Sequence, residues 1–216
     1  MKDEILGQKF NIDIDVDFQE QEDFFSDTPL PKASDIKLGN IVTMDKHITK
    51  FLSRKDSIKE ELPNKIKDDE SLHLISNGSF GSNELLMAIN EKYHITNLIC
   101  CTWSINNDFI DVIRDLDAHC TLIIDKSIIA RKAHFYARFL SYCKNSKTVL
   151  IAGMHAKLTL IETEYSGNIV YEASANYSSN VRIEQFTLTN SKNLYKFHHE
   201  WIESLINGKH ESSKMY

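Results

Sequence analysis

The sequence predicts an α/β fold in which a mixed β-sheet is flanked by helices on both faces. From Leu72 onward, short apolar segments alternate with longer amphipathic ones, which is typical of a sheet that helices cover on both sides. The chain has 216 residues, of which 42% are hydrophobic and 10% aromatic, and this is ordinary for a globular domain with a sizeable core. We expect two parts, an acidic arm over residues 1–35 and an α/β domain over residues 36–216.

The expected arm accounts for all of the net negative charge of the chain, which is −6. Residues 1–30 contain nine acidic residues and two lysines, which leaves 22 acidic and 23 basic residues for the rest of the chain. Apolar and polar residues alternate from Phe10 to Phe18, which suits an added strand, while a disordered acidic tail explains the composition equally well. The nearly neutral domain allows nucleic acid as a partner without favouring it.

The elements of the domain follow from hydrophobic periodicity. A charged segment from Ile48 to Leu62 is expected to be a helix that Pro63 stops. Short apolar runs then predict strands over residues 71–75, 97–104, 120–125, 148–152, 156–161, 169–172 and 183–188. A turn rich in Gly and Ser over residues 77–83 opens a helix that continues to Tyr93. Further amphipathic segments predict helices over residues 108–117, 127–143 and 192–206.

Cysteine usage and the lack of long apolar segments predict a cytoplasmic location. Four cysteines occur, Cys100, Cys101, Cys120 and Cys143, and no two of them form a Cys-x-x-Cys pair. They are expected to be buried thiols, not a zinc site or a disulfide framework. No apolar run approaches the ~20 residues of a membrane helix, and the first residues lack the core of a signal peptide.

The segment from His155 to Gln185 carries the most informative pattern. His155 and Lys157 are two residues apart in a predicted apolar strand, so their side chains are expected on one face. Ser174 and Asn176 follow in a later turn, and Glu184 lies in the next predicted strand. An imidazole and an ammonium that point to the same place indicate an anion, most simply phosphate. The alternative is a β-hairpin with a surface histidine and lysine and an ordinary polar turn.

This pattern resembles the signature of the phospholipase D superfamily, which has His, any residue, Lys, four residues and Asp, followed later by Gly-Ser-any-Asn. His155 and Lys157 match, and Ser174 and Asn176 match in the later turn. The sequence departs from the signature where Glu162 replaces Asp and Ala173 replaces Gly. The resemblance is sharp over residues 149–190 and extends by element order alone to about residue 70.

The resemblance implies a mechanism for phosphodiester cleavage. His155 would be the nucleophile and form a phosphohistidine, while Lys157 and Asn176 would hold the non-bridging oxygens. Ser174 would add a donor, and Glu184 would orient the imidazole. Glu162 would be a structural partner of the motif. The scheme requires no metal ion or other cofactor.

The resemblance also implies partners. The family uses two motifs, one for the nucleophile and one for the acid that protonates the leaving oxygen, whereas this chain has one. A homodimer is therefore implied. A metal-independent endonuclease that cuts DNA or RNA is the first hypothesis, and no amphipathic membrane-binding segment supports a lipid substrate. The basic residues Arg131, Lys132 and Arg138 on one predicted helix are candidates for binding nucleic acid. The alternative is a non-catalytic module that binds nucleic acid or a protein.

Overall fold

A computed structural model describes residues 47–52, 58–78, 80–116, 118–178 and 182–212. The expected acidic arm over residues 1–35 lies outside the described residues. The elements are, in order, β1 (His47–Leu52), α1 (Ile58–Glu61), β2 (Glu70–Asn77), α2 (Ser82–Tyr93), β3 (Ile95–Thr102), α3 (Asn107–Asp115), β4 (His119–Asp125), α4 (Ile128–Arg131), α5 (Ala133–Tyr142), β5 (Ser146–Ile151), β6 (Leu158–Thr163), β7 (Gly167–Ala173), β8 (Ile183–Asn190) and α6 (Lys192–Ser212).

The strands form one mixed sheet of eight, in the order β1-β2-β8-β7-β6-β3-β4-β5. Strands β3, β4 and β5 are parallel to one another, whereas β6, β7 and β8 form antiparallel pairs with their neighbours. Strand β8 also pairs with β2 in the antiparallel sense, and β1 is parallel to β2. The predicted fold class, a mixed sheet with helices on both faces, is confirmed.

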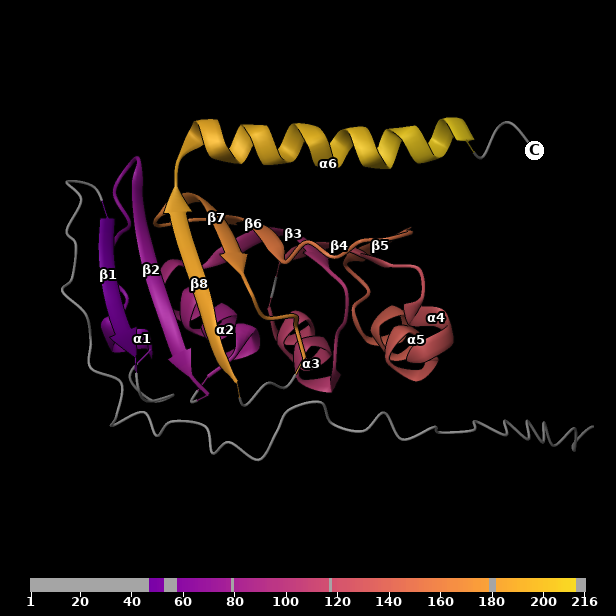
Figure 1. The fold of residues 1–216 in the computed structure, drawn as a ribbon, viewed down its shortest axis with the longest axis horizontal. Coiled ribbons are helices and arrows are strands. Elements are labelled where there is room, and N and C mark those ends of the chain that lie inside the picture. The colour runs from indigo at the N-terminus through magenta and orange to yellow at the C-terminus, as the bar shows by residue number, and fades with distance from the viewer. Residues whose placement is uncertain (1–46, 53–57, 79, 117, 179–181, 213–216) are drawn as a thin grey trace, which may run out of the picture. The chain divides into compact units, whose positions relative to one another are not determined.

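Helices cover the two faces unequally (Figure 1). Helix α6 crosses one face, while α2, α3 and α5 lie on the other. Because side chains alternate along each strand, the sheet contributes residues to two separate cores, one on each of its faces. The larger core contains Leu98, Cys100 and Leu122 and is closed by α2, α3 and α5. The smaller core contains Cys101, Ile123 and Leu160, against which Ile202 of α6 packs.

Three predicted boundaries are wrong. The segment from Ile48 to Leu52 is part of β1, not of a helix, because its backbone pairs with β2, and sheet pairing overrides weak helical propensity. The helix predicted over residues 127–143 is divided into α4 and α5 at Lys132, whose φ of −146° is not helical. Strand β6 begins at Leu158, so His155 and Lys157 lie in the segment that leads into the strand.

The cysteines agree with the expectation of buried free thiols, since all four are buried and none forms a disulfide. Burial raises the pKa of the Cys143 thiol to about 11, which keeps it protonated and unreactive near neutral pH. Among the helices that the structure describes, none combines the length and the apolar character needed to cross a bilayer.

Candidate active site

The topology of the sheet brings the ends of six strands to one edge. Strands β3 and β4 end there, and the antiparallel strand β6 begins there because its residue Leu158 pairs with Cys101 of β3. Leu158 also pairs with Glu172, so β7 ends at the same edge, where Ala173 pairs with Phe186 near the start of β8. Strand β2 ends beside the start of β8. Segments that are distant in sequence therefore meet at one place.

His155 and Lys157 form the centre of this edge. The Lys157 Nζ lies 3.0 Å from His155 Nδ1 and donates to the His155 carbonyl oxygen at 2.9 Å. His155 is exposed and Lys157 is half-buried. Burial lowers the pKa of Lys157, and the nearby Glu184 carboxylate acts in the opposite direction. The predicted pair is thus brought together, although the two residues precede the strand.

Ser174 and Glu184 lie beside this pair, because they follow β7 and belong to β8. The Ser174 hydroxyl donates a hydrogen bond to the buried Glu184 carboxylate. The same Ser174 oxygen accepts from the Gln185 N–H at 3.0 Å, which fixes the turn to the start of β8. The expected orientation of the His155 ring by Glu184 stays a prediction.

Asn176 is held with its amide oxygen turned inward. Its Oδ1 accepts from the Trp103 N–H and the Thr102 hydroxyl, both at 3.3 Å. The next residue, Tyr177, is buried and forms a 2.6 Å hydrogen bond with Thr159 of β6. With the oxygen engaged by the end of β3, the amide nitrogen is the part of Asn176 that can donate to an anion.

Sequence reasoning missed Trp103, which comes directly after β3. Its ring centroid lies 5.9 Å from that of His155. The Arg131 guanidinium stacks over the indole at 3.9 Å from the ring centroid and also donates to the Trp103 carbonyl at 3.3 Å. A usable signal existed, because polar and aromatic residues that follow parallel strands gather at one edge of a sheet.

The three candidate basic residues have different positions. Arg131 reaches the site through Trp103, and the Lys132 ammonium donates to the Ser104 hydroxyl at 3.1 Å in the same region. Arg138 instead pairs with Asp111 of α3 at 3.0 Å and stacks on Tyr142. The structure therefore places Arg131 and Lys132, but not Arg138, beside the predicted site.

A second network that the sequence did not reveal supports the turn before His155. The Asp125 carboxylate, at the end of β4, accepts from the Ser127 hydroxyl and from the Gly153 N–H at 2.8 Å. The hydrogen bonds from Ser127 lower the pKa of Asp125, with smaller contributions from Gly153 and the Arg131 charge. Gly153 has a φ of +74°, a conformation that favours glycine, so this turn depends on its identity.

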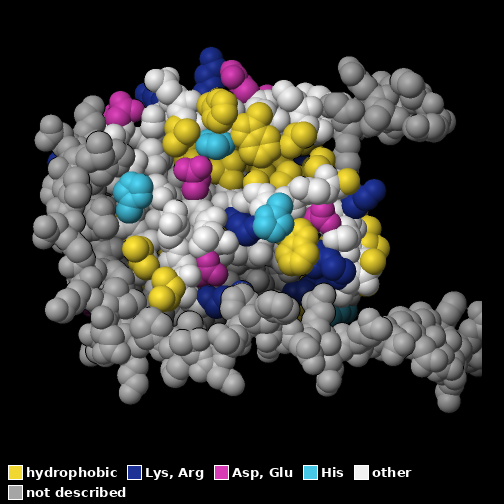
Figure 2. Space-filling view, viewed as in Figure 1, with side chains coloured by type: hydrophobic (Ala, Val, Ile, Leu, Met, Phe, Trp, Pro, Cys, Tyr) yellow, Lys and Arg dark blue, Asp and Glu magenta, His cyan; other side chains and the backbone are white. Residues whose placement is uncertain are grey.

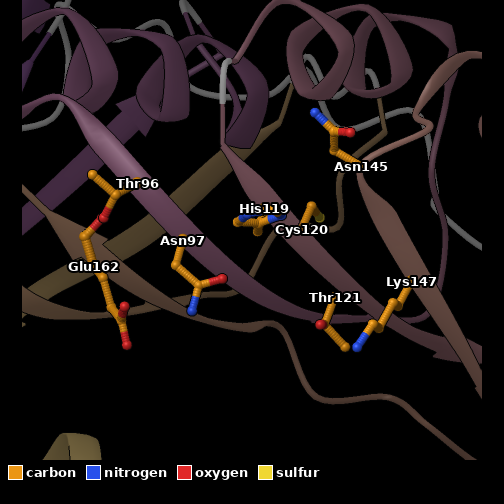
Figure 3. A pocket seen from close by; sticks show the side chains of 8 residues that line it. All are labelled: Thr96, Asn97, His119, Cys120, Thr121, Asn145, Lys147 and Glu162. Atoms are coloured by element: carbon orange, nitrogen blue, oxygen red, sulfur yellow. The ribbon is translucent and has the colours of Figure 1, made fainter.

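Glu162 lies at the opposite edge, five residues along β6 from Lys157, which corresponds to roughly 16 Å of strand. It accepts a 3.0 Å hydrogen bond from the Tyr195 hydroxyl of α6. It also lines an open hollow of about 440 Å³ (Figure 3), together with Thr96, Asn97, His119, Cys120, Thr121, Asn145 and Lys147. In Figure 3, Asn97, Thr121 and Glu162 point to the same side of the sheet. At this distance Glu162 cannot contact a phosphate held by His155.

The site is open to solvent and mixed in charge. Figure 2 shows histidine and basic side chains together in the middle of the visible face, with a hydrophobic patch above them. Across the part of the chain that the structure describes, no group of three or more His, Cys, Asp or Glu side chains is arranged to hold a metal ion.

Comparison with solved structures identifies the fold. No protein-family model and no curated protein matches the sequence. Nuc from Salmonella typhimurium, a phospholipase D family member, is similar with a TM-score of 0.50 and 14% identity, over 64% of this chain and 95% of that one. NucT from Helicobacter pylori has a TM-score of 0.49 and 17% identity, over 64% and 97% of the two chains.

A mutant of the yeast tyrosyl-DNA phosphodiesterase is more distant, with a TM-score of 0.35 and 13% identity over 53% of this chain and 27% of that chain. The similarity to Nuc and the mixed sheet bordered by helices show that this chain has a phospholipase D superfamily fold.

Proposed function

We propose that this chain is a phosphodiester hydrolase, most simply an endonuclease that acts without a metal ion through a phosphohistidine intermediate. One observation carries the proposal. The imidazole of His155 and the ammonium of Lys157 lie 3.0 Å apart at the edge of the sheet that also holds Ser174, Asn176 and Glu184. A phosphodiester is an anion that needs both a nucleophile and charge stabilisation, and this group supplies both.

The residues divide the chemistry between them. His155 Nε2 attacks phosphorus, the bond to the leaving oxygen breaks, and water then hydrolyses the phosphohistidine. Lys157 and the amide nitrogen of Asn176 hold the non-bridging oxygens as charge develops in the transition state. Ser174 adds a hydroxyl donor. Glu184 accepts the Nδ1 hydrogen of His155 and stabilises the charged ring.

The contact between Lys157 and His155 adds a condition to this scheme. A charged Lys157 donates to Nδ1, and the single ring hydrogen of the neutral imidazole then lies on Nε2. Attack through Nε2 requires the other tautomer. Substrate binding therefore moves the ammonium from Nδ1 to a phosphate oxygen, and Nδ1 becomes the donor to Glu184. Binding of the anion thus prepares the nucleophile.

The active unit in this proposal is a homodimer. The sequence contains a single His-any-Lys pair, and the scheme needs a second imidazole to protonate the leaving oxygen. A two-fold axis beside the exposed His155 places the same residue of a second copy opposite the first. In this arrangement, each phosphodiester site is built from residues of two chains.

Nucleic acid is the proposed substrate. Arg131 and Lys132 lie beside the site and provide two cations for the phosphates that flank the one being cut. The second candidate function is a non-catalytic module that binds nucleic acid or a protein through the same edge, and the departures of Glu162 and Ala173 from the signature motivate it. The two candidates differ in turnover.

Hydrolysis of bis(p-nitrophenyl) phosphate tests the enzyme proposal without any assumption about bases. Wild type should release nitrophenol, and His155→Asn should not. His119→Asn is a matched control, since it makes the same change in an exposed histidine at the opposite edge. A phosphorus label retained on wild-type protein in alkali and lost in acid would identify the phosphohistidine. Full turnover by His155→Asn would place the chemistry elsewhere.

A further inference from the structure

Trp103 is a large aromatic side chain held at the proposed phosphate site. Its backbone N–H donates to Asn176 at 3.3 Å, and its carbonyl accepts from Arg131 at 3.3 Å. The guanidinium lies over the indole at 3.9 Å, and the His155 ring lies 5.9 Å away. The position of the indole is therefore fixed from the backbone and from the ring.

Despite these contacts, 36% of Trp103 remains exposed to solvent. A bound phosphate does not explain the position of the indole, because the face of an aromatic ring is electron-rich and repels an anion. The part of a nucleic acid that does bind such a ring is the base, which has a π-face of its own. Arg131 extends the surface of the indole, and guanidinium groups also stack on bases.

We propose that Trp103 and Arg131 form a stacking platform for the base next to the scissile phosphate, and that the substrate is therefore single-stranded or unpaired nucleic acid. The inference rests on the proposed function for the position of the phosphate. In a duplex each base is already stacked and paired, and its release costs about as much as stacking on a protein ring returns. In a single strand no such cost opposes the contact.

The size of the effect follows from known stacking energies. A base stacked on an aromatic side chain contributes ~1–3 kcal/mol, which is about 5- to 150-fold in affinity at 1.4 kcal/mol per factor of ten. Trp103→Leu should weaken binding of a single strand by a factor in this range. Trp103→Phe, which keeps a ring, should recover part of the loss. DNA and RNA oligomers measured in parallel report which sugar the site accepts.

Tryptophan fluorescence gives a direct readout, since the chain contains only two tryptophans. The other, Trp201, is half-buried on α6 and donates to His198. The variant Trp201→Phe makes Trp103 the single fluorophore, and a second change, His155→Asn, prevents cleavage. A single-stranded oligomer of about ten nucleotides, within the usual range of site sizes, should quench Trp103. An abasic oligomer of equal length and charge, and the corresponding duplex, should bind without quenching.

Two results would overturn the platform: equal quenching by the abasic oligomer, or no quenching by a single strand that binds. Where Trp201→Phe does not fold, the ratio of kcat/KM for single-stranded to abasic substrate replaces fluorescence. That ratio should fall in Trp103→Leu, whereas a purely structural role would lower both values equally and leave it unchanged. Failure to hydrolyse the nitrophenyl diester would count against the proposed function and not against the platform, because quenching needs no turnover.

Discussion

Tyr177 directly follows Asn176, the residue proposed to donate a hydrogen bond to the phosphate. Tyr177 should act as a structural anchor and not as part of the chemistry. Its hydroxyl forms a 2.6 Å hydrogen bond with Thr159 Oγ1, and both side chains are almost fully buried, at 3% and 1% exposure. Tyr177→Phe keeps the ring, which packs at 4.5 Å from Phe109, and leaves the Thr159 hydroxyl without this partner. A buried polar group that loses its partner costs about 1–3 kcal/mol.

The same reasoning fixes the outcome of a double-mutant cycle. Thr159→Val should lower the free energy of unfolding by a similar ~1–3 kcal/mol, because it leaves the Tyr177 hydroxyl buried and unpaired. The double variant removes both polar groups, so its loss should be smaller than the sum of the two single losses by roughly 1–2 kcal/mol.

Urea unfolding of the four proteins at one protein concentration measures these differences, provided that the m-value is unchanged. Losses that add to within about 0.5 kcal/mol would show that the two hydroxyls are not coupled, and the account of how Asn176 is positioned would fail. Asn176→Ala is the comparison for function. It should reduce turnover while Tyr177→Phe retains most of it.

Three further predictions concern the chemistry. Because His155 and Lys157 supply the nucleophile and the cation, hydrolysis should persist in excess EDTA, and activity that is lost and then restored by magnesium or zinc would contradict the covalent histidine. Burial lowers the pKa of Lys157, so the alkaline fall of kcat/KM should occur at lower pH than for an ordinary lysine. The alkaline fall should move to still lower pH in Glu184→Gln, which removes a charge that raises the pKa of Lys157, and to higher pH in Lys157→Arg. A profile that is unchanged in both variants would refute the role of Lys157. Subunits of His155→Asn mixed equally with wild type and fully exchanged should give about a quarter of full activity, and a value near half would refute the shared site.

The sequence was sufficient to predict the class of fold and to single out the pair His155 and Lys157. Strand and helix periodicity identified the strands from β2 onward, because each of them places apolar residues in or against a buried core, and β3, β4, β6 and β7 do so on both faces of the sheet. His155 and Lys157 were found by spacing alone, and the structure brings their side chains together. Ser174 and Glu184, which the sequence also grouped, are joined by a hydrogen bond, since the antiparallel pairing of β7 with β8 brings the two residues together.

The missed features depend on contacts between distant segments. Trp103 reaches the site because β3 and β6 are neighbours in the sheet, which the order of elements does not reveal. The break between α4 and α5 occurs at Lys132, whose ammonium is bonded to Ser104, 28 residues earlier. The strand β1 was predicted as part of a helix, in which its backbone would form hydrogen bonds within the segment. In the structure these hydrogen bonds are made with the neighbouring strand β2, and the sequence of β1 does not reveal that partner.

The two departures from the phospholipase D signature can now be weighed against the geometry. Ala173 would be a liability if the backbone at that point required a positive φ, but among the described residues only Asp69 and His94 combine a side chain with a positive φ. Ala173 lies at the end of β7 and pairs with Phe186 as an ordinary strand residue. Glu162 lies roughly 16 Å along β6 from Lys157, where it accepts from Tyr195 of α6. The Ala173 backbone N–H donates to the Lys157 carbonyl at 3.0 Å, a contact that glycine would make equally well, and Glu162 lies far from His155. The departures therefore give no reason for lost chemistry, which removes the sequence argument for the non-catalytic module.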